Sequence, residues 1–260
     1  GMGVGMLGLA YNSIPVAVLG FGGCILHILN HSIFKELMFF AAGSVYNKTH
    51  TRNIEVLGGL LKSMPKTAAL CLIGSVAICG LPPFNGFISE FLIYFGMLKG
   101  ALVDNLGMLI ISILALAGLA LVGTMAILCF TKLFSIAFLG LPRSEHAENV
   151  KEDVVSSMIF PMGCLALLTL LVGLFPQFVF ELFSKPVSIF TGAIEVPSII
   201  NLLQTISFTA FGLLVFIFVL AVWKKLAGKK SASHETWGCG YDKPNNHIQY
   251  TASSYASPFL

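Results

Sequence analysis

The chain has 260 residues, of which 56% are hydrophobic and 10% are charged, and its formal net charge is +3. A soluble domain carries about 25% charged residues, so this composition, with a mean hydropathy of +0.88, excludes an ordinary soluble enzyme. The weak positive charge gives no sign of a nucleic-acid partner. Several apolar stretches reach the roughly 20 residues that a helix needs to cross a bilayer. We therefore expect an all-α, polytopic bundle of transmembrane helices in a lipid bilayer.

The predicted helices follow one another along the chain with short polar breaks. Residues 1–10 are apolar but cover only half a span, and we interpret them as the end of a helix that begins earlier in a longer protein. The stretch 67–99 is apolar but interrupted, residues 176–199 are mixed and look interfacial, and the tail after residue 223 is polar. Complete spans are predicted at 15–46, 106–139, 154–175 and 200–223.

The interrupted stretch 67–99 decides the topology, because it can form two short crossings or one broken crossing. Cytoplasmic loops carry an excess of Lys and Arg. One crossing places twelve of the 15 Lys and Arg residues on one side and two, Lys99 and Lys185, on the other, whereas two crossings nearly remove this bias. We therefore predict one discontinuous helix, with residues 47–66, 140–153 and the C-terminal tail in the cytoplasm.

The predicted break contains four residues that disfavour a continuous helix: Gly80, Pro82, Pro83 and Gly86. A continuous helix over 67–99 would be about 50 Å long, against a hydrocarbon core of about 30 Å. Proline lacks a backbone donor, and unpaired backbone at membrane depth is tolerated only where it faces protein or water. Broken helices of this kind mark binding sites in transporters. A simple proline kink is the alternative interpretation.

Three ionisable residues within the span 15–46 share one helix face. His27, His31 and Lys35 are spaced four residues apart, so they form a column about 12 Å long. Ionisable groups at membrane depth are costly and usually face a bundle interior or a hydrated cavity. Two imidazoles and an amine in a column suit proton transfer through bridging waters. The alternatives are polar residues that hold helices together and, with less support, a zinc site, for which no third ligand lies nearby in sequence.

Two further residues complete the predicted relay. Glu90 lies just after the break, in the first turns of the second half-helix, where Asn85 is the predicted N-cap. A carboxyl group at that position can exchange a proton during turnover, and a structural ion pair is the alternative. Lys132 lies near the predicted cytoplasmic end of its span, where extension of the side chain towards the interface is the alternative to a role in the relay.

The motifs around these residues identify a family resemblance. The run 26–43, which contains His27, His31 and Lys35, resembles the antiporter-like membrane subunits of complex I and related hydrogenases, as do the run 80–90 and the link 51–60. The tail segments 236–241 and 249–254 resemble the branch of hydrogenase-4 component B and formate hydrogenlyase subunit 3. Glutamate at position 90 differs from the lysine of the largest complex I subunit and is similar to other branches.

The resemblance implies an organisation that the residues alone do not show. Family members contain two inverted five-helix repeats, each with a broken helix. The chain would hold the end of the second repeat in residues 1–139, additional C-terminal transmembrane helices in 140–223 and a polar cytoplasmic tail in 224–260. By resemblance, His27, His31 and Lys35 match the central relay helix, and Glu90 matches the ionisable residue of the second broken helix.

The predicted function is proton translocation in the inner (plasma) membrane, as a subunit of a membrane-bound hydrogenase or formate hydrogenlyase complex. The resemblance implies that the subunit binds no redox cofactor and couples to electron transfer in other subunits, its partners in the membrane. No metal site is predicted. The alternatives are a subunit of NADH-quinone oxidoreductase, a subunit of a multisubunit sodium/proton antiporter, with Na⁺ in place of H⁺, and a structural membrane scaffold.

Overall fold

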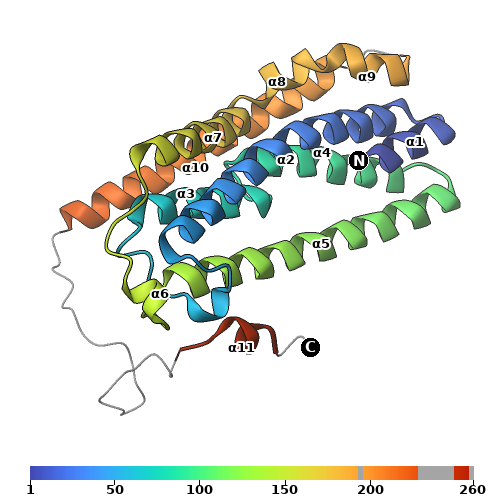
Figure 1. Cartoon of the computed structure of the whole chain (residues 1–260). Coiled ribbons are helices and arrows are strands. Elements are labelled where there is room, and N and C mark those ends of the chain that lie inside the picture. Colours follow the sequence, from blue (N-terminus) through green and yellow to red (C-terminus); the bar gives the residue numbers. More distant parts are fainter. Residues whose placement is uncertain (193–195, 228–248, 258–260) are drawn as a thin grey trace.

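The structure is a computed structural model, and it describes residues 1–192, 196–227 and 249–257 (Figure 1). These residues form helices and connections without a β-strand. The tail motif at 236–241 lies outside the described residues. The helices are α1 (Met2–Ala10), α2 (Ile14–Thr49), η1 (a 3₁₀-helix, Ile54–Val56), α3 (Pro65–Ile78), α4 (Asn85–Ala101), α5 (Leu106–Phe138), α6 (Glu145–Glu148), α7 (Ser156–Leu174), α8 (Pro176–Leu182), α9 (Ser184–Thr191), α10 (Val196–Leu226) and α11 (Ala252–Ala256).

Four of the described helices are long and apolar enough to cross a membrane: α2, α5, α7 and α10. They coincide with the predicted spans to within a few residues, and the prediction of an all-α polytopic membrane bundle is confirmed. Two short helices, α8 and α9, occupy the predicted interfacial region, and α6 lies in the predicted loop at 140–153.

Helix α2 is at the centre of the bundle, in contact with α1, α3, α4, α7 and α9 (Figure 1). Glycines allow its closest approach to α1. A Cβ atom at Gly20 would collide with the backbone of Gly5, and one at Gly8 would collide with the backbone of Ala17. Small residues at the contact bring helix backbones together in membranes, where lipid is as apolar as the side chains. The sequence of α1 and α2 therefore specifies this antiparallel pair.

Helices α3 and α4 lie end to end along α2, separated by the non-helical residues 79–84. Gly80 in this linker has a left-handed φ of 63°, and the Pro82–Pro83 bond is cis. A Cβ atom at Gly86 would collide with the carbonyl of Ala77, so the half-helices meet closely. Their contacts with α2 follow in antiparallel order: Leu37 with Gly74, Asn30 with Asn85, His27 with Ser89, and Gly23 with Ile93. That the pair makes one crossing of the bilayer stays a prediction.

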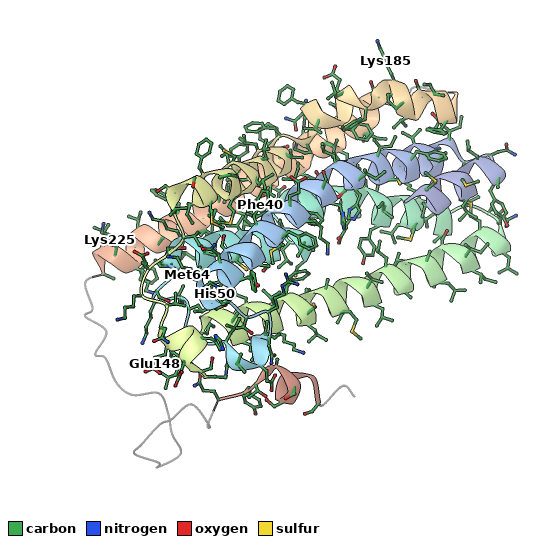
Figure 2. The ribbon with its side chains drawn as sticks, in the orientation of Figure 1. Phe40, His50, Met64, Glu148, Lys185 and Lys225 are labelled. Atoms are coloured by element: carbon green, nitrogen blue, oxygen red, sulfur yellow. The ribbon has the colours of Figure 1, made fainter. Side chains whose placement is uncertain are left out.

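Polar loops between the helices lie together at one end of the bundle. Arg143 donates hydrogen bonds to the carbonyls of Leu57, Ile136 (2.7 Å) and Tyr250 (3.1 Å), so it joins its own loop to the residue after η1, to the last turn of α5 and to the segment before α11. Figure 2 shows Lys225, His50 and Glu148 towards this end and Lys185 at the opposite end. The loops for which a common side is predicted, 47–66 and 140–153, thus lie together in the structure.

Helix α5 is held mainly at its ends. Its fully buried residues are Met108 and Ser112 near the start, and Ile136, Ala137 and Phe138 at the end. The residues between 113 and 135 are exposed or half-buried. In Figure 1, α5 accordingly runs beside the bundle and diverges from α2 over its middle part.

Candidate functional site

The predicted column on α2 is visible in the structure as two neighbouring imidazoles and a lysine one turn further on. The ring centroids of His27 and His31 are 6.0 Å apart, and the buried Phe34 presents its edge to both rings at 6.3 Å and 5.4 Å. His27 is half-buried, His31 is exposed and Lys35 is half-buried. Among the described residues, Lys35 has no hydrogen-bond or ion-pair partner. The column is therefore open on one side in this structure.

A buried hydrogen-bonded group joins α2 to the first turns of α4. We call it the α2–α4 polar cluster: Asn30, Asn85 and Ser89, each with no exposed surface. Asn30 Nδ2 donates to the Asn85 carbonyl at 2.8 Å and to Ser89 Oγ at 3.1 Å, and Asn85 Nδ2 donates to Asn30 Oδ1 at 3.2 Å. His27 Nδ1 lies 3.0 Å from Ser89 Oγ. The cluster thus connects the histidine column to the residue that precedes Glu90.

The prediction that Asn85 caps α4 is wrong. The N-cap position is occupied by Phe84, without a side-chain hydrogen bond, and Asn85 is the first helical residue. Its amide points to α2 instead, where Asn30 offers a buried carbonyl oxygen. A buried polar group must find a partner at membrane depth, so the tertiary contact prevails over the local cap. Asn85 Oδ1 has no partner among the described residues.

Glu90 lies half-buried in the second turn of α4, with its carboxylate against the break. A Cβ atom added to Gly80 would collide with Glu90 Oε2. Glycine at position 80 therefore serves two purposes, because it adopts a left-handed φ and leaves room for the carboxylate. Within the described part of the chain, the Glu90 side chain forms no hydrogen bond or ion pair. The structure thus places a carboxyl group without a fixed partner beside the junction of two half-helices.

Lys132 is separate from this group. It lies on α5, half-buried, and its backbone carbonyl accepts a hydrogen bond from Ser135. Its ammonium group has no hydrogen-bond or ion-pair partner in the residues that the structure describes. In the part of the chain that the structure describes, no hydrogen bond or ion pair joins it to the histidine column or to Glu90, so the structure brings together four of the five predicted relay residues at most.

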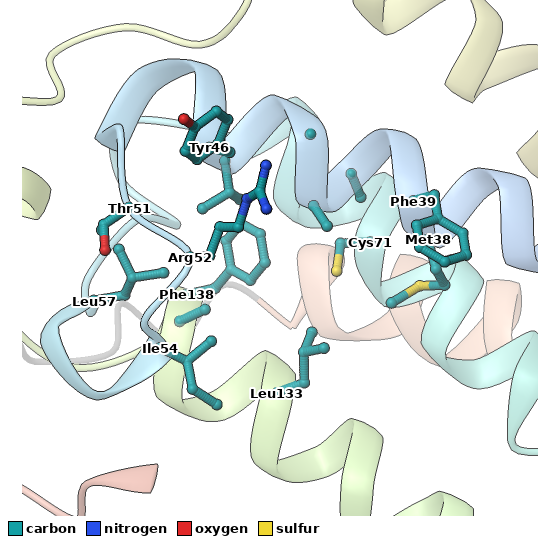
Figure 3. Close-up of a pocket in the computed structure, with 15 residues that line it drawn as sticks. Met38, Phe39, Tyr46, Thr51, Arg52, Ile54, Leu57, Cys71, Leu133 and Phe138 are labelled. Carbon is teal, nitrogen blue, oxygen red and sulfur yellow. The ribbon is translucent and has the colours of Figure 1, made fainter.

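A cavity of about 480 Å³ lies between α2, α3, α5 and the loop after α2 (Figure 3). Its walls are mostly apolar, and at one end the Arg52 guanidinium lies 4.9 Å from the centre of the Tyr46 ring. None of the predicted relay residues lines it. The cavity and the predicted relay residues therefore lie in different places. We base the functional argument on the ionisable residues, because their burial within apolar helices costs free energy and so needs an explanation.

The sequence interpretation missed the role of Ser89 in joining α2 to α4. Asn30 and Ser89 lie within the motif runs 26–43 and 80–90, but neither residue was assigned a role from the sequence. Their spacing contains a signal, since His27 and Asn30 are three residues apart on α2, and Asn85 and Ser89 are four apart on α4. Each pair presents two polar side chains on one helix face, but only the tertiary structure shows that these faces meet.

The comparison with protein families identifies this fold. The family described as NADH:quinone oxidoreductase/Mrp antiporter, TM, matches residues 2–117. Residues 2–117 are therefore similar to this family. The match covers α1 to α4 and the first part of α5, and so includes the histidine column, the α2–α4 polar cluster and Glu90.

Similar proteins extend the relationship over the rest of the chain. Hydrogenase-4 component B of Escherichia coli (strain K12) is 34% identical over 94% of this chain and 38% of that protein. Formate hydrogenlyase subunit 3 of the same organism is 33% identical over 99% of this chain and 42% of that protein. The chain thus spans about two fifths of the length of these curated relatives.

A solved structure supports the fold of this chain. The membrane-bound sulfane sulfur reductase, an archaeal respiratory membrane complex, contains a chain with a TM-score of 0.67 and 20% sequence identity. The match covers 92% of this chain and 38% of that one. The chain, with its four helices long and apolar enough to cross a membrane in the described residues, therefore has a fold similar to that of the matched chain.

Proposed function

We propose that this chain is part of a proton-translocating membrane subunit of a hydrogenase- or formate hydrogenlyase-type redox complex. The observation that carries the proposal is the 3.0 Å contact between His27 Nδ1 and Ser89 Oγ, which holds the histidine column of α2 beside the half-helix that bears Glu90. Protons would move along His27, His31 and Lys35 and exchange at Glu90. The identities of 34% and 33% to subunits of such complexes support it.

The spacing of the groups supports transfer through water. The centroids of the two imidazole rings are 6.0 Å apart, which exceeds the length of a direct hydrogen bond between ring nitrogens. Bridging waters close such gaps at little cost where polar groups can hold them. His31 is exposed and Lys35 half-buried in this structure, so both are accessible to water or to a further polar element. Lys132 stays a predicted member of the relay without a contact that supports it.

The proposal assigns electron transfer to partner subunits and predicts no redox cofactor in this chain. It places the protein in the inner (plasma) membrane, with residues 47–66, 140–153 and the C-terminal tail in the cytoplasm. The clustering of these two loops at one end of the bundle supports this topology. The division at residue 139 into an antiporter-like part and additional helices also stays a prediction, since α7 packs against α2, α3 and α4 across that boundary.

The test is Glu90→Gln in the full-length complex, reconstituted in vesicles. The amide keeps the size of the side chain but binds no proton, so we expect proton pumping to fall to background while the complex still assembles. Glu181→Gln is the control, because Glu181 lies exposed on α8, away from the cluster, and its variant should pump normally. Pumping by Glu90→Gln at the wild-type ratio of protons to electrons would contradict the proposal.

A second candidate is a subunit of a sodium/proton antiporter, which the family description favours because it includes Mrp antiporters. The same residues would then exchange ions without redox chemistry. Sodium-driven proton movement in vesicles that receive no electron donor would support this candidate. Co-purification with a hydrogenase large subunit would support the first, and co-purification with NADH-oxidising subunits would indicate NADH-quinone oxidoreductase.

A further inference from the structure

The Ser89 hydroxyl is the centre of the α2–α4 polar cluster and has three partners. Asn30 Nδ2 donates to its oxygen at 3.1 Å, Ser89 itself donates to the Gly86 carbonyl at 3.1 Å, and His27 Nδ1 lies at 3.0 Å. A hydroxyl group has one proton and two lone pairs, so three partners fill its capacity. Because Ser89 has no exposed surface, its bonding must be satisfied by these neighbours.

The first of the three bonds has a fixed direction. Asn30 Nδ2 lies 2.8 Å from the Asn85 carbonyl, which can only accept, and Asn30 Oδ1 accepts from Asn85 Nδ2. The reverse orientation of the Asn30 amide would set two oxygens against each other and two nitrogens against each other. Asn30 therefore donates to Ser89 and occupies one of the two lone pairs of the hydroxyl oxygen.

The direction of the His27 bond follows by counting. If Ser89 donates to the Gly86 carbonyl, its remaining lone pair faces His27, and Nδ1 must carry a proton. If the hydroxyl rotates to donate to His27, the bond to Gly86 is lost and two of the three remain. In a buried site no water replaces the lost bond, so the arrangement with all three is favoured.

We propose that Asn30 and Ser89 hold the neutral form of His27 with its proton on Nδ1, so that His27 takes up and releases protons at Nε2. The role in proton transfer rests on the proposed function, but the tautomer of His27 can be measured whether or not that function is correct. The neutral ring accepts a proton at Nε2 to form the imidazolium and releases it from the same atom. The bond from Nδ1–H to Ser89 is unchanged in both forms.

Asn30 and Ser89 are thus positioning residues, and the proton path does not pass through the serine. Apart from His27 itself, the one acceptor that the described residues offer to the Ser89 proton is the Gly86 carbonyl, a backbone oxygen that cannot pass a proton on. Although Ser89 precedes Glu90 in sequence, exchange between Glu90 and His27 must therefore take another route, from Nε2. The cluster keeps the ring in one orientation and leaves one basic nitrogen free.

The test uses the full-length subunit in its complex, labelled with ¹⁵N-histidine in lipid bilayers. The difference between the solid-state NMR spectra of the wild type and His27→Gln isolates the His27 ring. At a pH where the ring is neutral, we expect a protonated Nδ1 and a bare Nε2. A bare Nδ1 would overturn the proposal, whatever the variants below show.

Ser89→Ala tests the part of the hydroxyl. Loss of one buried hydrogen bond should shift the ratio of the two tautomers about tenfold towards the form with a bare Nδ1. Ser75→Ala is the matched control, since Ser75 is also buried between α2 and a half-helix but its hydroxyl faces Met38 Sδ at 3.8 Å. Its tautomer ratio should equal that of the wild type. An unchanged ratio in Ser89→Ala would overturn the role given to Ser89.

These outcomes are distinct from failure of the proposed function. If Glu90→Gln pumps normally, proton translocation through this site is contradicted, while the His27 tautomer stands or falls on its own spectrum. If Glu90→Gln abolishes pumping and the wild-type Nδ1 is bare, the function survives and the tautomer assignment is wrong. If the Ser89→Ala complex does not assemble, the difference spectrum of the wild type still shows which nitrogen of His27 carries the proton.

Discussion

Helices α2 and α5 are of similar length, but their surroundings are opposite to what their hydropathy suggests. The most apolar 18-residue window of α5 has a mean hydropathy of 2.5, and 11% of that window is buried. The corresponding window of α2 has a mean hydropathy of 1.6, and 56% of it is buried. In a soluble protein the more apolar helix would be the more buried. In a membrane the helix with more ionisable residues belongs inside, because lipid accepts apolar side chains and penalises charged ones.

The two helices are also held in different ways. Helix α2 is held along its length by close backbone contacts at its glycines and by the α2–α4 polar cluster. Helix α5 is held at its ends, and a polar residue in its middle, Thr124, donates to the carbonyl of Ala120 in its own helix. Changes of equal chemistry should therefore have unequal effects on the two helices.

The largest effect is expected from a side chain added where α2 meets α1. Gly20→Val places a branched side chain against the Gly5 backbone, which cannot move aside as a side chain can. We expect the free energy of unfolding in bilayers to fall by about 3 kcal/mol or more. Gly118→Val is the control on α5, because apart from the adjacent backbone of its own helix no described atom lies within 4 Å of its added Cβ, and its effect should stay within about 0.5 kcal/mol. Comparable losses in both variants would contradict the contrast between the helices.

An intermediate effect is expected from removal of a polar side chain. Asn30→Leu leaves the Asn85 side chain and the Ser89 oxygen without their partner in a buried site, at a cost of about 2 kcal/mol. Thr124→Leu on α5 removes a hydroxyl bonded to its own helix and should change stability by less than about 0.5 kcal/mol. Thermal denaturation of the detergent-solubilised protein measures both, and equal midpoints would break the comparison.

The smallest effect concerns the polar end that holds the last turn of α5. Glu55 accepts hydrogen bonds from the Ser253 amide at 2.9 Å and from its hydroxyl at 2.6 Å, and these bonds lower the pKa of this carboxyl group. A lowered pKa in the folded state means that the ionised form stabilises the contact above the ordinary pKa of glutamate. This contribution is lost as the pH falls through the lowered value.

Amide hydrogen exchange at residues 252–256 should therefore become faster in acid in the wild type, by a modest factor because Glu55 is only half-buried and solvent screens its contacts. In Glu55→Ala the exchange, corrected for its intrinsic dependence on pH, should be fast at every pH. The midpoint of the change in the wild type should lie below the ordinary pKa of glutamate. A midpoint above that value would show that the two bonds do not favour the carboxylate.

The positions of the helices were predictable from the sequence. Long apolar runs define α2, α5, α7 and α10, and the prolines and glycines between Gly80 and Gly86 define the interruption between α3 and α4. The cap at Asn85 was not predictable, because a local rule favours the N-cap while a residue 55 positions away supplies the actual partner. The identification of His27 and Glu90 depended on residue type and depth, but the contact between His27 and Ser89, the residue before Glu90, depended on packing.

By itself, the sequence determined which segments are apolar enough to cross a membrane, where the helix is interrupted and which ionisable residues lie within the spans. These properties are local, because they follow from transfer of each segment into lipid and from the backbone chemistry of proline and glycine. The tertiary structure decided that α2 rather than the more apolar α5 lies inside, and that Asn30, Asn85 and Ser89 meet around His27. That outcome is non-local, because a buried polar group takes whichever partner the packing of two helices brings within hydrogen-bond distance.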